Sequence, residues 1–348
     1  MRMRLIIFTS LLLVLFSILL PLFLVGQVDP LTYPSPDKAA LLQKPALDDT
    51  LVAIPHDDGQ DATLLLRVFV EDEIVELSMA DFLYGVVAAE MPARFHPEAL
   101  RAQAVAARTY TLHRMLISPS PRHPDAQVCG SYACCKAFHT PERLRERWGA
   151  QYAHYSALIR AAVADTDGIV LVYDNAPILA AFHASSYGST EASSAIWNSV
   201  PYLQSVETFE SMEDVPNYYA ETRFSFSEFR QIAQANIPGT VLNDGNKPYW
   251  ISDVQYTDSG RLHSLHIGGI SVTGAQFRQI FGLRSTAITF FFDAESISLQ
   301  TGGHGHGVGM SQFGANTMAN RGHPFYEILL WYYTNVTFAR MSEVLALQ

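Results

Sequence analysis

The chain has 348 residues, of which 49% are hydrophobic and 16% charged, so it is long enough to bury a full core and is neither a disulfide-stapled mini-protein nor a disordered tail. Its formal charge of −11 argues against a nucleic-acid partner, because such partners bind to a basic face. All three cysteines fall between Cys129 and Cys135, which excludes a scattered disulfide framework.

An uncharged run from Leu5 to Val25 follows Arg2 and Arg4. As a helix, its roughly 21 apolar residues would span ~30 Å, the hydrocarbon thickness of a bilayer. The run exceeds a usual signal-peptide core and ends in a poor cleavage site. We therefore expect residues 1–26 to be a retained transmembrane signal anchor. A cleaved signal peptide and a buried core helix are the alternatives. The positive-inside rule places the N-terminus in the cytoplasm and the rest of this single-pass cell-membrane protein outside.

Residues 27–60 are rich in proline and aspartate and are predicted to form a stalk. An extracytoplasmic body over 61–340 follows, with a helix-rich lobe at 61–166 and a mixed strand and helix lobe at 167–340. The patterns predict a hairpin at 64–77, helices at 78–90, 97–115, 141–150 and 152–165, strands at 169–173 and 178–183, a helix at 223–237, strands at 250–254 and 262–267, a helix at 274–281, a strand at 287–292, and helices at 311–320 and 324–333. This mixture, without alternating βαβ units, predicts a two-lobed α+β fold.

Glu90 is the first candidate for chemistry. It ends the apolar run from Tyr84 to Ala89 and precedes Met91-Pro92. Apolar neighbours disfavour the charged form of a carboxylate, which is the condition for a general acid at neutral pH. The alternative is a solvated residue at a helix C-terminus.

A second candidate is a metal site made of His123, Cys129, Cys134 and Cys135, which lie within thirteen residues of an irregular loop at 118–140. Three thiols and an imidazole can supply the four tetrahedral ligands of Zn²⁺. Two alternatives remain open. In an oxidising compartment Cys129 would form a disulfide with Cys134 or Cys135, or all three would be reduced structural thiols.

Two further segments carry polar chemistry. Residues 302–314 hold many glycines with His304 and His306, which indicates backbone bent close to a ligand or another strand. Their spacing is not that of a dinucleotide-binding loop, and two histidines without a third ligand do not make a metal site. Residues 182–191 form a small polar segment suited to hydrogen-bonding a polyhydroxyl substrate. They contain no serine-nucleophile elbow.

Together these segments resemble the family of stage II sporulation protein D. The resemblance rests on Gly85 to Pro92, on Glu98 to Tyr110, and on His306 to Ala315 with Tyr332-Tyr333-Thr334. It covers residues 62–340. It implies lytic transglycosylation, a lyase reaction that cleaves peptide-stripped peptidoglycan strands between N-acetylmuramic acid (MurNAc) and N-acetylglucosamine (GlcNAc) and leaves 1,6-anhydroMurNAc ends. The implied catalytic acid is Glu90.

The resemblance also bears on the cysteine loop. Some relatives bind zinc through His-x5-Cys-x5-Cys, a spacing that His123, Cys129 and Cys135 match. Where those relatives have a histidine as fourth ligand this chain has Cys134, which can replace it. With four protein ligands the Zn²⁺ would be structural. A second departure is Tyr187-Gly188, where the family commonly has Gly-Gly.

Candidate substrate-binding residues follow from the same segments. Arg101 and Arg108 lie seven apart on one helix face, where they could meet the lactyl carboxylates of stripped glycan. A solvated or ion-paired face is the alternative. The remaining candidates are groove residues for which a structural hydrogen bond or a core position is the alternative: Tyr110, His183, Ser185, Thr190, His306, Ser311 and Gln312.

The expected partners are peptidoglycan glycan strands, the membrane through the N-terminal helix, and a cell-wall amidase in an engulfment complex during sporulation. Because some relatives are named as amidase enhancers, a non-catalytic wall-binding activator of an amidase is the rival function. A metal-dependent wall hydrolase using His304 and His306 lacks ligands.

Overall fold

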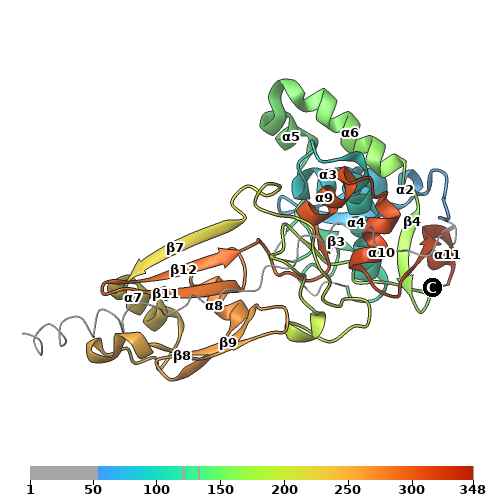
Figure 1. Ribbon diagram of the computed structural model, residues 1–348. Helices are drawn as coiled ribbons and strands as arrows, with labels where there is room; N and C mark the ends of the chain where they lie inside the picture. Colours follow the sequence, from blue (N-terminus) through green and yellow to red (C-terminus); the bar gives the residue numbers. More distant parts are fainter. Residues whose placement is uncertain (1–53, 120–121, 132–133, 348) are drawn as a thin grey trace, which may run out of the picture. The chain divides into compact units, whose positions relative to one another are not determined.

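The computed structural model describes residues 54–119, 122–131 and 134–347, all of which belong to the compact unit Gln43–Gln348. The predicted anchor at 1–26 and most of the predicted stalk at 27–60 lie outside the described residues. In the part of the chain that is described, no helix combines the length and the apolar character needed to cross a membrane. The fold is mixed α and β, as predicted (Figure 1).

The hairpin predicted at 64–77 is confirmed as β1 (Leu65–Val70) and β2 (Glu73–Ser78), which pair antiparallel. A short helix, α2 (Gln60–Thr63), precedes it, and β3 (Val128–Cys129) joins the open edge of β1 in parallel. Ser78 caps the next helix, α3 (Met79–Glu90), by accepting a hydrogen bond from the Asp81 N–H. The helix ends where Met91 becomes extended ahead of Pro92.

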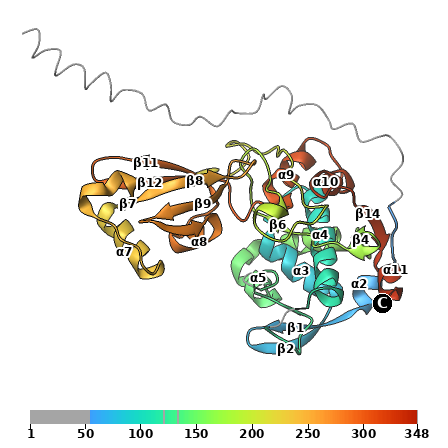
Figure 2. The same ribbon diagram turned by 90° about the horizontal axis from the view of Figure 1, so that it is seen from below.

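Helix α4 (Pro97–Leu116) runs through the centre of the first hydrophobic core. Its alanines are fully buried and let α3, α6 (Tyr152–Ala164) and two C-terminal helices, α9 (Gln312–Asn320) and α10 (Phe325–Tyr332), approach closely (Figures 1 and 2). Between α4 and α6 come α5 (Pro141–Trp148) and a 3-10 turn, η2 (Gly149–Gln151). The first core therefore takes helices from both ends of the described chain.

A small sheet flanks these helices. It has the order β14-β4-β5, from β14 (Thr337–Arg340), β4 (Ile169–Tyr173) and β5 (Ala176–Pro177), and the last helix is α11 (Met341–Ala346). Asp174 and Asn175 make the tight turn with φ of 50° and 62°. The strand predicted at 178–183 is only two residues long, β6 (Phe182–His183), because Ala180 and Ala181 donate their N–H groups to Ile178 and Leu179 instead of to a strand.

A second hydrophobic core holds residues between Phe226 and Leu299. Its sheets have the orders β11-β12-β7 and β10-β9-β8. The elements are β7 (Tyr219–Ser225), α7 (Phe226–Asn236), η4 (Asp244–Tyr249), β8 (Ile251–Tyr256), β9 (Leu262–Ile267), β10 (Ile270–Thr273), α8 (Gly274–Ile280), β11 (Ala287–Phe292) and β12 (Ser296–Gly302).

The helix predicted at 223–237 begins only at Phe226. Ser225 forms a capping box with Glu228, so residues 223–225 are the end of β7. The lobe division predicted at residue 166 stays a prediction, and the first core contains residues from both sides of it.

Arg108 joins four segments of the first core through one guanidinium. Its Nε lies 2.8 Å from Asp61 Oδ1 at α2, and its Nη atoms donate to the carbonyls of Ile169 and Val163. The side chains of Arg108 and Asp61 are 0% and 4% exposed. The structure therefore places Arg108 inside the body and not beside Arg101 on a surface. Arg108 is therefore ion-paired, which was the alternative to glycan binding, and its buried position gives no support to a direct glycan contact.

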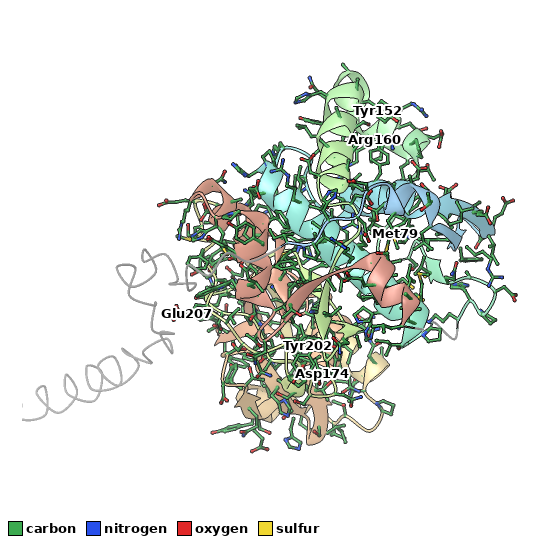
Figure 3. All side chains as sticks on the ribbon, turned by 90° about the vertical axis from the view of Figure 1, so that its right-hand side faces the viewer. Met79, Tyr152, Arg160, Asp174, Tyr202 and Glu207 are labelled. Atoms are coloured by element: carbon green, nitrogen blue, oxygen red, sulfur yellow. The ribbon has the colours of Figure 1, made fainter. Side chains whose placement is uncertain are left out.

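Replacing Arg108 with alanine is expected to lower the free energy of unfolding by about 3–5 kcal/mol, since the Asp61 charge would stay buried without its partner. Chemical denaturation measures this loss. Arg160→Ala is the matched control, because Arg160 on α6 (Figure 3) pairs with Asp81 at 3.2 Å while both side chains are about half exposed. It should cost about 1 kcal/mol or less. Equal losses in the two variants would contradict the structural role of the buried pair.

Candidate active site and metal centre

Glu90 stands at the C-terminal end of α3, half-buried, and its Oε1 accepts a hydrogen bond of 3.1 Å from the Ala137 N–H. The loop that carries Ala137 can lie on α3 because residue 85 is glycine. A Cβ there would come within 2.2 Å of the Phe138 ring. The Gly85 carbonyl also accepts the His139 N–H at 3.2 Å. The glycine of the first motif thus brings a backbone donor to the carboxylate five residues later.

Lys136, which the sequence analysis missed, lies beside Glu90. Its Nζ is 4.1 Å from the centroid of the Tyr110 ring and 3.6 Å from that of Phe182. Burial lowers the pKa of Lys136 to about 8, and the nearby Glu90 carboxylate opposes that shift. The sequence offered only a weak indication that Lys136 belongs to the site: it is one of only four lysines and directly follows the cysteine pair.

The two polar segments meet through a short parallel pair of strands, β6 and β13 (Met310–Ser311), which aligns Phe182 with Met310 and His183 with Ser311. Gly309 makes this approach possible. It has φ of 73°, and a Cβ there would lie 2.0 Å from the Ala181 carbonyl oxygen. The glycine-rich segment therefore bends close to another strand, one of the two options that its composition indicated.

His183 is buried between these segments. Its Nδ1–H donates to the Val308 carbonyl at 3.2 Å, and its Nε2 accepts from the Ser186 hydroxyl at 2.6 Å. Burial, followed by the neighbouring His306 and Arg261, lowers the pKa of His183 well below its usual value. The imidazole is therefore neutral and acts here as a hydrogen-bonded part of the framework.

His306 lies nearer the surface. Its Nδ1 accepts the Val308 N–H at 3.1 Å, and its ring centroid is 5.7 Å from that of His183 and 5.0 Å from that of Trp197. Burial and the charge of Lys136 lower the pKa of His306 to about 3. Trp197 is 43% exposed, and sequence reasoning missed it. A neutral imidazole thus lies near the charge of Lys136, and the exposed indole of Trp197 packs against that imidazole.

Four predicted groove residues are buried and hydrogen-bonded inside the protein. The Ser185 N–H donates to the His304 carbonyl, and Thr190 Oγ1 accepts the Val206 N–H. The Ser311 hydroxyl donates to the Glu210 carboxylate, and the Gln312 side-chain amide donates to the Gln103 side-chain carbonyl. All four residues therefore make structural hydrogen bonds, the alternative to substrate contact that the sequence left open. Substrate contact by any of them stays a prediction.

The sequence analysis also missed two buried carboxylates, Glu191 and Glu210, that hydrogen-bond these polar segments. Glu210 Oε1 accepts the Ser186 N–H and the Ser311 hydroxyl, and burial raises the pKa of Glu210. Glu191 Oε2 accepts hydroxyls from Thr257 and Ser259, at 2.6 and 2.7 Å, which tie the turn between β8 and β9 to the polar segment.

The cysteine loop brings its ligand atoms together. The donor atoms of His123, Cys129 and Cys134 lie within 4.8 Å of one another, and Cys135 Sγ is 3.7 Å from Cys134 Sγ. None of the three cysteines forms a disulfide. Tetrahedral Zn²⁺ with sulfur ligands at ~2.3 Å needs ligand atoms about 3.8 Å apart, which this cluster approaches. His123, Cys129 and Cys134 therefore fit a zinc ion as three of its ligands, whereas Cys135, the predicted fourth, lies outside the group whose donor atoms are all within 4.8 Å of one another.

The surroundings of the cluster also suit a metal. Phe69 stacks on the His123 ring at 3.9 Å, and the position of Cys129 is fixed by the pairing of β3 with β1. Burial raises the pKa of the Cys129 thiol to about 12 and also raises that of Cys135. Metal binding would release these protons, so it is the event that makes such buried thiols anionic.

The fold and site define an α+β protein with one half-buried glutamate beside a lysine and a Cys/His cluster. The family model "Stage II sporulation protein" matches residues 70–173. Stage II sporulation protein D of Bacillus amyloliquefaciens is 33% identical over 275 residues, covering 78% of this chain and 77% of the relative. Its counterpart in Bacillus subtilis (strain 168) is 31% identical over 313 residues, covering 89% and 87%.

An amidase enhancer of Bacillus subtilis (strain 168) is 28% identical over 303 residues, covering 73% of this chain and 40% of the relative. The chain belongs to the stage II sporulation protein D family. The resemblance inferred from the motifs is thereby confirmed.

Acid is expected to destabilise the protein partly through His183. Because the folded pKa of His183 is depressed, the unfolded chain binds the proton first, and stability falls as the pH drops below the unfolded value of ~6.5. One such group contributes a slope of up to about 1.4 kcal/mol per pH unit. Urea denaturation between about pH 7 and pH 5 should show a shallower slope for His183→Gln. Ser186→Ala, which keeps the imidazole, should retain the slope; identical slopes for wild type and His183→Gln would reject this account.

The full-length protein is expected to carry about one Zn²⁺ per chain, and Cys129→Ser or His123→Ala should lose most of it and lower the melting temperature. Elemental analysis and thermal denaturation measure the two effects. His154→Ala is the matched control, since His154 is an exposed imidazole on α6. A wild-type protein that is folded yet free of zinc after growth in zinc-supplemented medium would disprove the metal centre.

Proposed function

We propose that this protein is a peptidoglycan lytic transglycosylase that cleaves peptide-stripped glycan strands during spore engulfment, with Glu90 as its catalytic acid and base. Membership in a sporulation family supports the process and the cell-wall context. The observation that carries the chemistry is the position of Glu90. Glu90, in the first family motif, is a half-buried carboxylate that accepts the Ala137 N–H, and the charge of Lys136 lies close to it.

A single carboxylate is sufficient for this reaction. Glycoside hydrolases use two carboxyl groups, one as acid and one as base or nucleophile. In lytic transglycosylation the C6 hydroxyl of MurNAc attacks its own C1, so no water needs activation. Glu90 protonates the glycosidic oxygen as its bond to C1 breaks, then takes the proton of the C6 hydroxyl as the anhydro bond forms. The attack is intramolecular and gains from effective molarity.

The other carboxylates near the glycine-rich segment are consistent with this assignment. Glu191 and Glu210 are 3% and 5% exposed, and both accept hydrogen bonds from backbone and hydroxyl groups. Each is committed to holding the framework together. Unlike these two, Glu90 is partly exposed and belongs to a family motif.

We further propose that His123, Cys129, Cys134 and Cys135 hold a structural zinc ion. Bound zinc would fix the loop that follows, in which Lys136 and Ala137 face Glu90. Four protein ligands leave no open coordination position for chemistry on substrate.

The proposed location follows from the sequence. Residues 1–26 would anchor the protein as a single-pass segment, with residues 27–60 as a stalk and the catalytic body outside the membrane. A catalytic body on the outer face of the cell membrane would contact the cell wall directly. A cell-wall amidase would act before it, because stripped strands arise when the peptides are removed.

A second candidate function is a wall-binding activator of an amidase. The observation that favours it is the similarity to a protein named amidase enhancer, of which this chain spans 40%. An activator needs wall binding but not the carboxylate of Glu90, so the two functions separate at that residue.

Purified full-length protein incubated with peptide-free glycan strands is expected to release anhydro-muramyl products, identified by mass spectrometry. Glu90→Gln should lower the rate by about 10²–10⁴-fold, since the amide can neither donate nor accept the proton. The matched control is Glu142→Gln, because Glu142 on α5 is exposed and pairs with Arg145. It should retain the wild-type rate.

Three results would contradict the enzymatic proposal. They are equal activity of wild type and Glu90→Gln, products carrying a reducing end from simple hydrolysis, or no cleavage by folded wild-type protein. In the last case, stimulation of a purified amidase by both wild type and Glu90→Gln would support the activator instead.

A further inference from the structure

A protein that prefers peptide-stripped strands must recognise a chemical group that differs between stripped and peptide-bearing strands. In a stripped strand the lactyl group on C3 of each MurNAc ends in a free carboxylate. In a peptide-bearing strand the same carbonyl is part of an amide and carries no charge. A cation within one sugar ring of the catalytic glutamate distinguishes the two, because the lactyl group and the scissile C1 belong to the same ring.

The arginines expected to meet this carboxylate are occupied elsewhere. Arg108 is buried and paired with Asp61. Arg101 is 29% exposed and engages both Glu98 and Asp165, with its Nε 3.0 Å from Asp165 Oδ2. Both guanidinium charges are neutralised by carboxylates of the protein itself, so the anion-binding role needs another cation.

Lys136 has the required position. Its backbone neighbour, Ala137, donates the hydrogen bond to Glu90, which keeps the lysine and the carboxylate in one local structure. Two ring faces, from Tyr110 on α4 and Phe182 on β6, flank the Nζ and hold it without neutralising it. Among the described residues Lys136 takes part in no ion pair, whereas Lys247 lies 3.9 Å from Asp244.

The aromatic support also explains why a lysine can be specific here. A free lysine side chain samples many rotamers, and ordering it on binding costs conformational entropy. Contacts with two rings restrict Lys136 before substrate arrives, so less entropy is lost when an anion binds. Tyr110, predicted as a substrate-binding residue, would then act by positioning this ammonium group.

We propose that Lys136 binds the lactyl carboxylate of the MurNAc residue at the cleavage site and thereby selects peptide-stripped glycan. This inference rests on the proposed function, and it assigns to one residue the substrate preference that the family resemblance implies. The ammonium group donates a charge-assisted hydrogen bond to the carboxylate, and the uncharged lactyl amide of a peptide-bearing strand cannot replace that partner.

The test compares two forms of one substrate at a single pH. Stripped strands are used as such, or after carbodiimide coupling with methylamine has converted the lactyl carboxylates to methylamides. For the wild type, kcat/KM should be about tenfold higher on the free-acid strands, the size expected for one charge-assisted hydrogen bond. In Lys136→Gln the ratio should fall to about one, and in Lys136→Arg it should largely persist.

Lys247→Gln is the matched control, since it removes the same charge from η4 in the second core, and it should keep the wild-type ratio. Zinc content and melting temperature confirm that each variant is folded. A Lys136→Gln protein that loses activity equally on both strands would overturn the proposal, because it would show that Lys136 only supports Glu90. An unchanged ratio would overturn it as well.

Binding of the same two strands to the Glu90→Gln protein separates this inference from the proposed function. Isothermal titration calorimetry should give a Kd about tenfold lower for the free-acid form, and Lys136→Gln in the same background should abolish the difference. A Kd ratio near one in the folded Glu90→Gln protein would reject the role of Lys136. If the wild-type protein does not cleave the strands but the Kd ratio stays near ten, the proposed enzymatic activity is rejected and the role of Lys136 in binding stands.

Discussion

The hydrogen bond from the Ala137 N–H to the Glu90 carboxylate joins the two halves of the site. One half is α3, which ends at Glu90, and the other is the loop that follows the cysteines. Their contact depends on Gly85, where any side chain would collide with Phe138. The same loop positions Lys136 against Tyr110 and Phe182. The element that fixes Cys134 and Cys135 therefore also fixes the Ala137 donor and the Lys136 cation beside Glu90. A metal bound at these cysteines would thus order that side of the site by geometry alone.

Behind this site lies a buried polar framework. An unpaired polar group in a protein interior costs free energy, whereas a satisfied network gives the interior one preferred arrangement. His183 and Ser186 bond each other, and Glu210 accepts from Ser186 and Ser311. These bonds connect residues 182–191 to residues 302–314, which are far apart in sequence. The small polar residues of the motifs therefore hold two loops together, and beside them the partly buried His306 packs against the exposed Trp197.

The sequence was sufficient for the elements whose signals are local. Ser78, Pro92 and Pro97 mark helix ends, and the ends of α3 and α4 fall there. The carboxylate of Glu90 and the cluster of His123 with the cysteines also stood out, because motif and spacing are local properties. Arg108 and Lys136 did not. Whether an arginine is buried depends on Asp61, which is 47 residues away, and the rings around Lys136 come from α4 and β6. Periodicity places a residue on a helix face, but only tertiary packing decides what covers that face.

The charge of the whole chain makes the local cation matter more. With 34 acidic against 23 basic residues, the protein repels a polymer that carries a carboxylate on every second sugar. At physiological ionic strength this repulsion is screened beyond about 8 Å, so it disfavours loose association more than it opposes contact. A lysine held between two rings acts inside that distance, where screening is weak. Under the proposed roles of Lys136 and Glu90, one preorganised cation beside the acid would favour strands in a single register, with the lactyl carboxylate at Lys136 and the glycosidic oxygen at Glu90. An evenly basic surface would bind the same strands more tightly but in many registers, most of them unproductive.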